Sequence, residues 1–218
     1  GQGRRDLACE LPGREQRRQE ARSNSYAPYV EQIFPVLAPV LQDGVPYVIC
    51  AHSFGTWLMY EFMKKLVTAG IPLPKQCIIS GFPSPDLPAA DRPWPHGSGK
   101  SDPDDKFKEN ARMWDVNEIA LDPNNFKVFG PLMRDDFSCF DEYVYTPLPD
   151  CIPSGFPVPF QVYYAADDKR VKKGHTEGWK KFTSEKCDVY EAVGHHLFFF
   201  DVPARAKYME AAISRLPF

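Results

Sequence analysis

Short apolar runs alternate with amphipathic segments along most of this chain. The apolar runs predict four main strands and a further short strand near the start, at 46–51, 76–80, 160–166, 188–192 and 7–11. Apolar residues spaced three or four positions apart predict helices over 26–41, between Gly55 and Gly70, over 107–116 and 123–132, around Trp179, and over 204–216. Because strand and helix alternate, the predicted fold class is α/β, with a mainly parallel sheet covered by helices on both faces.

Prolines divide the predicted helices and mark one long irregular stretch. Pro35 and Pro39 are expected to kink or interrupt the helix at 26–41, because proline lacks the N–H that a helix interior needs. Between 83 and 105, prolines, glycines and aspartates are so frequent that no regular element is expected. Together with the helical pieces that follow, this stretch predicts an insertion over about 83–135, either a lid over a pocket or a structural excursion.

The composition limits the chain to a few classes of protein. At 218 residues it is long enough for one buried core, and we expect a single domain over 1–218 that is a monomer. A net charge of −3 argues against a nucleic-acid binder. The six cysteines form neither a CxxC pair nor a metal-ligand spacing, which favours a reducing compartment. The chain has neither an apolar run of about 18 residues nor the apolar core of a signal peptide. We therefore expect a protein with no membrane span that resides in the cytoplasm, with an organelle as the alternative location.

The stretch from Pro46 to Trp57 has the pattern of a nucleophile elbow. An apolar strand ends at the small Ala51, Ser53 comes two positions later, and Gly55 opens a helical pattern. A strand-to-helix turn this sharp needs small neighbours, and it pushes the serine hydroxyl out at the helix N-terminus. The alternative is an ordinary strand-to-helix turn, so the pattern gains its weight from the strand before it and the helix after it.

Acidic and basic partners for this serine follow two later predicted strands. Asp167-Asp168 follows the strand at 160–166, and Gly194-His195-His196 follows the strand at 188–192. Because the carboxyl ends of parallel strands share one edge of a sheet, we expect serine, aspartate and histidine to meet there. A serine that attacks an acyl group needs a base within hydrogen-bond reach and an acid that orients the base. The order Ser…Asp…His is the one that α/β-hydrolases use.

Each pair leaves a choice between neighbours. His196 is favoured over His195, because the first histidine would complete the turn and an apolar run follows the second directly. Asp168 is preferred to Asp167, with the other aspartate forming the turn. His52 is too close to the serine along the chain to approach its hydroxyl from across the site.

Five segments occur in an order and at intervals that a known family shares. They are Leu11-Pro12-Gly13-Arg14-Glu15, Ala51-His52-Ser53-Phe54-Gly55, Arg134-Asp135-Asp136-Phe137, Ala166-Asp167-Asp168 and Gly194-His195-His196-Leu197-Phe198. Together they resemble the type II thioesterase family, the discrete thioesterases of polyketide, nonribosomal peptide and fatty acid synthesis. The resemblance covers nearly the whole chain and implies an α/β-hydrolase fold with a helical lid. Matched position by position, it implies Ser53 as nucleophile, Asp168 as acid and His196 as base.

Three features depart from that family. Ala51 and His195 stand where the family has glycines. In the family, a strand and a glycine-rich turn also precede the motif at 11–15 and donate part of the oxyanion hole, and nothing here matches them. We therefore expect a sheet that lacks its N-terminal strand, and an oxyanion hole in which the backbone N–H of Phe54 is the remaining donor. Either the sequence is truncated or the domain is impaired.

The resemblance implies a two-step acyl transfer. Ser53 would attack a thioester on the phosphopantetheine arm of an acyl or peptidyl carrier protein within a synthase complex, and water would then release the free acid. That chemistry needs no metal and no other cofactor of the enzyme. Two alternatives stay open: an α/β-hydrolase that acts on oxygen esters, and a catalytically impaired hydrolase fold that only binds carrier proteins.

Two further groups of residues have an open role. The basic segment Lys169–Lys173 could meet an acidic carrier protein, or it could be a solvated loop. Four apolar residues of the predicted insertion could line an acyl pocket or form the insertion's own core: Met113, Trp114, Phe126 and Phe129.

Overall fold

The structure is a computed structural model that describes residues 6–217, and its centre is a four-stranded sheet. The strands are β1 (Val48–His52), β2 (Gln76–Ser80), β3 (Phe160–Ala165) and β4 (Cys187–Ala192). They pair in the order β1-β2-β3-β4, and every pair is parallel. The four main strand predictions and the parallel sheet are confirmed.

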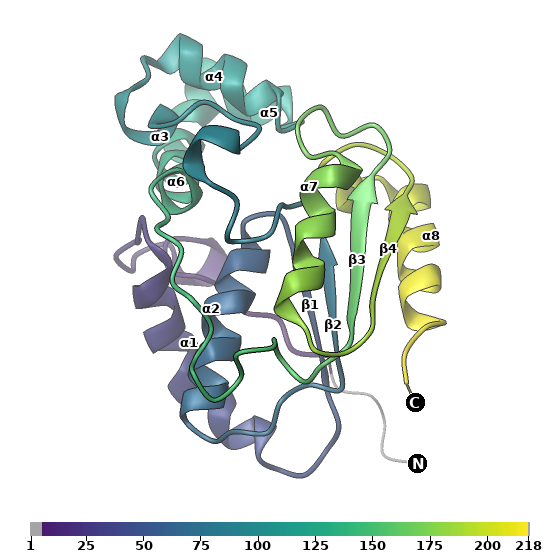
Figure 1. The fold of residues 1–218 in the computed structure, drawn as a ribbon. Coiled ribbons are helices and arrows are strands. Elements are labelled where there is room, and N and C mark those ends of the chain that lie inside the picture. The colour runs from purple at the N-terminus through teal and green to yellow at the C-terminus, as the bar shows by residue number, and fades with distance from the viewer. Residues whose placement is uncertain (1–5, 218) are drawn as a thin grey trace.

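Helices cover both faces of this sheet (Figure 1). α2 (Gly55–Thr68) and α7 (Lys173–Glu177) lie on one face, with α1 (Tyr26–Leu41) beside α2, and α8 (Val202–Ile213) lies on the other face. Side chains of β3 alternate between the two layers, because successive residues of a strand point to opposite faces. Short 3-10 helices occur at Glu15–Arg17, Ala89–Asp91, Gly178–Phe182 and Phe198–Phe200.

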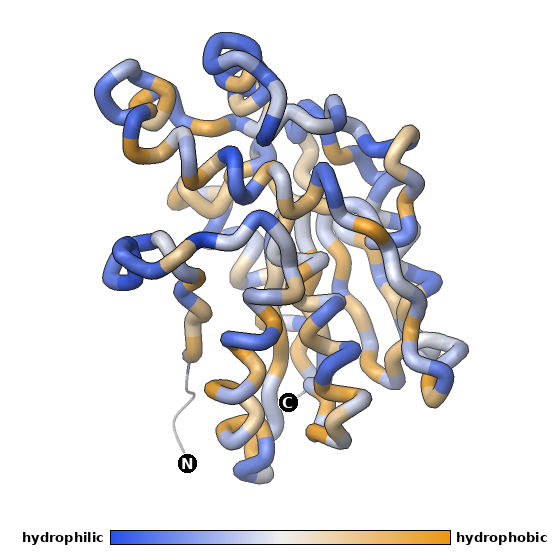
Figure 2. Tube along the Cα trace, turned by 90° about the vertical axis from the view of Figure 1, so that its left-hand side faces the viewer, coloured by the Kyte–Doolittle hydropathy of each residue, from blue (hydrophilic) through white to orange (hydrophobic). Residues whose placement is uncertain are grey.

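The hydropathy of the chain follows these layers. Figure 2 shows apolar residues along the strands and along one side of the helices, while the loops are mostly polar. The larger core lies under α1, α2 and α7 and contains the fully buried Trp57 and Trp179. The smaller core lies under α8 and contains Phe198 and Tyr208. All five residues of β2 are buried, as is typical of a central strand in a parallel sheet.

An insertion of helices lies between β2 and β3, over the carboxyl ends of the strands (Figure 1). It contains α3 (Ser98–Ser101), α4 (Asp104–Arg112), α5 (Glu118–Leu121) and α6 (Pro123–Asp141). The helix predicted at 107–116 ends earlier, at Arg112. The helix predicted at 123–132 continues to Asp141 and contains Pro131. The chain leaves α4 in a turn in which Asp115 takes a left-handed backbone conformation, with φ +58°.

The stretch at 83–105 is more regular than predicted. α3 begins after Gly97, whose φ is +71°. Asp141, at the end of α6, accepts hydrogen bonds from the Ser98 hydroxyl (3.1 Å) and from the Gly99 N–H (3.3 Å). The expectation of no regular element is therefore wrong, because a carboxylate from a distant helix satisfies the start of α3.

Residues 7–11 do not form the predicted strand. Leu7 is 64% exposed, and no strand within residues 6–217 pairs with this segment. Instead, the Glu10 carboxylate accepts a hydrogen bond from the Gln16 N–H (2.7 Å), and Leu11 packs into the larger core. A strand needs a neighbour for its backbone hydrogen bonds, so apolar character alone was not enough here.

α1 is continuous through both of its prolines, so of the two predicted effects, a kink or an interruption, the interruption does not occur. Pro35 and Pro39 lie on the exposed side of the helix. Each removes a hydrogen bond to the carbonyl four residues earlier, on the same side, where water can take its place. Tyr29 and Val30 on the opposite side are buried and hold the helix against the core.

A tight turn joins β1 to α2 and places Ser53 in a left-handed conformation, with φ +52°. The Ser53 N–H donates to the Ser80 carbonyl at the end of β2 (2.8 Å). The Thr56 hydroxyl donates to the Ser53 carbonyl (2.8 Å). These bonds hold a backbone conformation that is unfavourable for a residue with a Cβ atom.

Ser53→Gly is therefore expected to be more stable than Ser53→Ala, by about 1 kcal/mol, because glycine adopts a positive φ without the Cβ clash. Both variants lack the hydroxyl, so the comparison isolates the backbone. Urea unfolding measures the difference in the free energy of unfolding. If the alanine variant is equally stable, the turn is not strained.

Asp141→Asn is expected to stabilise the protein more at pH 7 than at pH 4. Burial raises the pKa of the Asp141 carboxyl to about 6, although hydrogen bonds from Gly99 and Ser98 oppose the rise. Between about pH 4 and 6 the folded protein holds a proton that the unfolded chain has released, so wild-type stability falls as the pH rises through that window. The amide escapes this loss, which amounts to about 3 kcal/mol at most.

Urea unfolding of wild type and Asp141→Asn across this pH range measures the effect. The difference in unfolding free energy between the two proteins should grow in favour of the variant as the pH rises. A difference that is the same at both ends of the range would contradict the buried, proton-holding carboxyl.

Candidate active site

A chain of hydrogen bonds joins Ser53, His196 and Asp168 at the carboxyl edge of the sheet. Ser53 Oγ lies 2.8 Å from His196 Nε2, and His196 Nδ1 lies 2.7 Å from Asp168 Oδ2. Because a carboxylate only accepts hydrogen bonds, Nδ1 carries the ring proton and Nε2 is free to accept the serine proton. The structure thus places together the three residues that the sequence singled out, from the loops after β1, β3 and β4.

Asp168 is held as a carboxylate although it is fully buried. Its Oδ1 accepts hydrogen bonds from the backbone N–H groups of Arg170 (2.8 Å) and Val171 (2.9 Å). Burial alone would raise the pKa of Asp168, but the hydrogen bond and charge of His196, together with these two N–H groups, bring it below its ordinary value. An ionised Asp168 fixes the tautomer and the orientation of the His196 ring.

The neighbours of this acid and this base point elsewhere. The His195 side chain is 44% exposed, and its Nδ1 accepts a hydrogen bond from the Leu197 N–H (3.1 Å). Asp167 is exposed, and its backbone N–H donates to the Gly194 carbonyl (2.9 Å). Gly194, with φ +104°, takes the left-handed position of this loop, so a histidine rather than a glycine at 195 fits without strain.

His52 lies against His196 but outside the hydrogen-bonded chain. The two ring centroids are 5.2 Å apart, and His52 Nδ1 is 3.0 Å from the hydroxyl oxygen of Ser80. Burial, and secondarily the neighbouring His196, lowers the pKa of His52 to about 3. A Cβ at Gly81 would lie 2.8 Å from the His52 ring, so glycine makes room for this packing. His52 is therefore a neutral wall of the site at neutral pH.

The backbone N–H of Phe54 is placed beside Ser53 at the start of α2. Within residues 6–217 this N–H donates to no hydrogen-bond acceptor. The Phe54 ring stacks on that of Tyr26, with centroids 6.3 Å apart, which fixes the residue. A free N–H at a helix N-terminus favours negative charge and suits an oxyanion on a group attached to the serine.

The four apolar candidates of the insertion divide into two buried and two exposed residues. Trp114 is 4% exposed and packs its ring edge-on against His196, with centroids 4.7 Å apart. Phe126 is 7% exposed and belongs to the larger core. Met113 and Phe129 are 41% and 44% exposed. Trp114 thus lines the site beside His196, whereas Met113 and Phe129 are exposed to solvent.

The basic segment Lys169–Lys173 makes contacts with the insertion that sequence reasoning missed. Lys169 Nζ pairs with Asp115 Oδ1 (2.6 Å). The Arg170 guanidinium lies over the Trp114 ring, 5.4 Å from its centroid. No local pattern signals these contacts, because they join segments that are far apart in the sequence.

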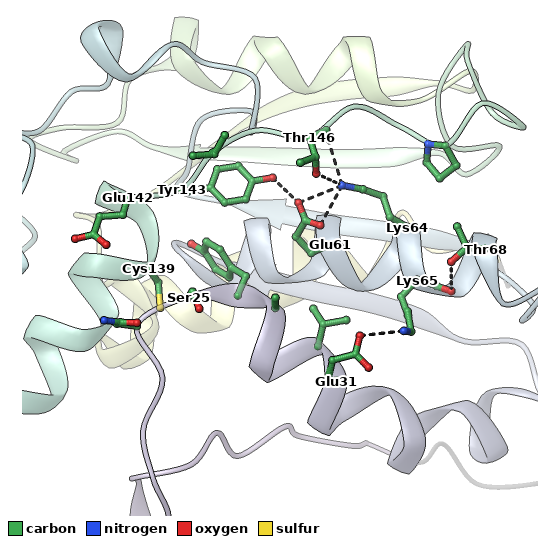
Figure 3. A pocket seen from close by; sticks show the side chains of 16 residues that line it. Ser25, Glu31, Glu61, Lys64, Lys65, Thr68, Cys139, Glu142, Tyr143 and Thr146 are labelled. Carbon is green, nitrogen blue, oxygen red and sulfur yellow. Dashed lines mark hydrogen bonds and ion pairs between the residues drawn. The ribbon is translucent and has the colours of Figure 1, made fainter.

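Within residues 6–217, one cavity lies beside α6 and another lies beside the turn after α4. The larger, about 580 Å³, lies between α1, α2 and the segment 142–149, as Figure 3 shows. Its polar groups are largely paired with one another: Lys64 with Glu61 (3.0 Å), and the Tyr143 hydroxyl with the Glu61 carboxylate (2.5 Å). The smaller, about 340 Å³, lies beside His195.

Metal sites and membrane-spanning helices are two further features that bear on residues 6–217. No group of three or more His, Cys, Asp or Glu side chains there is arranged to hold a metal ion. No helix in that range is both long enough and apolar enough to cross a membrane. The six cysteines are free thiols.

Comparisons with known proteins agree on the family. A model of the alpha/beta hydrolase family matches residues 1–206. The "Probable anguibactin biosynthesis thioesterase AngT" of Vibrio anguillarum is 27% identical over 196 residues, which cover 88% of this chain and 74% of that protein. The human "S-acyl fatty acid synthase thioesterase, medium chain" is 25% identical over 221 residues, covering 96% of this chain and 77% of that protein.

A solved structure shows the same fold. RedJ, a thioesterase from the prodiginine biosynthetic pathway of Streptomyces coelicolor, superposes with a TM-score of 0.80 and 22% identity, over 94% of this chain and 76% of RedJ. The predicted α/β-hydrolase fold and the resemblance to type II thioesterases are confirmed. The match over nearly the whole chain shows that it belongs to the alpha/beta hydrolase family.

Proposed function

We propose that this protein is a serine thioesterase that releases acyl groups from the phosphopantetheine arm of acyl or peptidyl carrier proteins, in polyketide, nonribosomal peptide or fatty acid synthesis. The observation that carries the proposal is the hydrogen-bonded chain from Ser53 through His196 to Asp168. AngT and the human relative described above are both named thioesterases, which supports a thioester as the bond that is cleaved.

In the first step Ser53 becomes acylated. His196 Nε2, 2.8 Å from Ser53 Oγ, takes the serine proton as the oxygen attacks the thioester carbonyl. The Phe54 N–H stabilises the negative charge that develops on the carbonyl oxygen, and such a donor is worth about 10²–10³-fold in rate. Asp168, buried and ionised, stabilises the imidazolium that forms on His196.

The thiol then leaves and water completes the cycle. The proton on His196 passes to the departing pantetheine sulfur, whose conjugate thiol has a pKa of about 8.5 and so needs little assistance. In the second step His196 takes a proton from water, the hydroxide attacks the acyl-serine, and the free acid is released with Ser53 protonated again. Both steps of the reaction use the same base, the same nucleophile and the same orienting acid.

A carrier protein as the donor of the acyl group is supported by the names of the relatives rather than by a surface of this chain. One relative is named for anguibactin biosynthesis and the other for a fatty acid synthase. In the basic segment Lys169–Lys173, the cations of Lys169 and Arg170 are engaged by the insertion. The proposed recognition of a carrier therefore does not rest on that segment.

A serine-directed fluorophosphonate is expected to add one phosphonyl group to the folded protein, at Ser53. His196 activates this hydroxyl, whereas an ordinary surface serine does not react. Intact mass and peptide mapping measure the adduct, with Ser53→Ala as the control that should take up none. Asp168→Asn should slow labelling by about 10⁴-fold, because His196 would then be held in the wrong tautomer. A folded wild type without an adduct would contradict the proposed enzyme.

Matched acyl donors then test the bond that is cleaved. We expect kcat/KM to be highest for an acylated carrier protein, lower for the same acyl group on pantetheine, and lowest for its oxygen ester. A preference for the oxygen ester would point to an esterase. Labelling of Ser53 without hydrolysis of any of the three donors would point to an impaired hydrolase fold.

A further inference from the structure

Asp115 has an unusual backbone conformation immediately after α4, in the insertion. Its φ of +58° places it in the left-handed region, which among the non-glycine residues of 6–217 is otherwise occupied by Glu15 and Ser53. Aspartate enters this region more readily than most residues, but glycine would do so at lower cost. The contacts of the Asp115 side chain offset this cost.

The Asp115 carboxylate bridges the two loops that carry the acid and the base. Its Oδ2 accepts a hydrogen bond from the backbone N–H of His196 (3.0 Å). Its Oδ1 pairs with Nζ of Lys169, the residue after Asp168, at 2.6 Å. The Asp115 side chain is 10% exposed and His196 is 2% exposed, so their contact is largely shielded from water, whereas the Lys169 side chain is 50% exposed. One carboxylate thus fixes the loop after β3 and the loop after β4 relative to each other.

Neighbouring contacts hold the same turn against the site. Lys169 Nζ also donates to the Arg112 carbonyl at the end of α4 (3.2 Å), where a cation is favourable. Trp114 packs edge-on against the His196 ring. The turn between α4 and α5 lies on the side of the insertion nearest the loop after β3 (Figure 1). The insertion and the hydrogen-bonded chain are therefore joined through the segment 112–115.

We propose that Asp115 is a positioning residue: by holding the His196 backbone and Lys169 together, it sets the direction of the His196 ring toward Ser53. This inference rests on the proposed function, since it assigns Asp115 a role in that reaction. The Asp168 contact fixes one ring nitrogen of His196, but the position of the ring also depends on where its backbone lies. A displacement of about 1 Å in a catalytic group can cost about 10²-fold in rate.

The test compares wild type with Asp115→Gly, Asp115→Asn and, as the control, Glu118→Gln. Glycine removes the carboxylate and also relieves the left-handed backbone, so the fold is expected to survive. Asparagine keeps an oxygen that accepts the His196 N–H. Glu118 makes an exposed ion pair with Arg112 (2.7 Å) close to the same turn, so its variant should match the wild type.

Two rates are measured on each protein: fluorophosphonate labelling of Ser53, and hydrolysis of an acyl-pantetheine. Asp115→Gly is expected to lower the labelling rate and kcat by about 10–100-fold, with KM changed by less than about twofold. Asp115→Asn should stay within about threefold of the wild type, because the hydrogen-bond acceptor is retained. Lys169→Met also removes the ion pair and keeps the His196 contact, so it too should stay within about threefold of the wild type. Thermal unfolding confirms that each variant is folded.

Each outcome decides the inference. A folded Asp115→Gly protein with wild-type labelling and kcat would overturn the positioning role. An Asp115→Gly protein that fails to fold would overturn it too, because the carboxylate would then serve the fold as a whole. A loss in kcat that asparagine does not rescue would also count against it. If the wild-type protein is neither labelled nor active, the proposed function itself is contradicted, and this result is independent of the variants.

Discussion

The site depends on one constraint: parallel strands in fixed register deliver three loops to the same edge of the sheet. His52 pairs with Ser80, Ser80 with Tyr163, and Ala165 with Ala192. The residues that follow these strand ends are then close enough for a continuous chain of hydrogen bonds from serine to carboxylate. A slip of register by one residue would turn these side chains to the other face and break that chain.

The surroundings set the charge states of two groups that contact His196. Asp168 is buried yet stays ionised, because a histidine and two backbone N–H groups compensate the lost water. Burial lowers the pKa of His52 to about 3, since the charge of Asp168 and the backbone of His196 compensate only part of the lost water. The site therefore presents one base and one acid at neutral pH. Two histidines and one strand-end carboxylate take different roles from their surroundings alone.

Much of the fold and the candidate site was predictable from the sequence because their signals are local. The apolar runs gave the four strands, and the residues just after them gave Ser53, Asp168 and His196 as a group at one sheet edge. Several of the failures are non-local. Among the described residues 6–217, no strand pairs with residues 7–11. α3 owes its start to Asp141, and the bridge from Asp115 joins loops from distant parts of the chain. Sequence patterns report propensity, whereas these features depend on which surfaces meet.

Rapid-quench mass spectrometry with an acylated carrier protein tests most directly whether Ser53 accepts the acyl group from a carrier-bound thioester. We expect a transient gain of the acyl mass on the peptide that contains Ser53, which decays at the rate at which free acid appears. Formation of free acid with no acyl group on that peptide, at quench times shorter than one turnover, would contradict it.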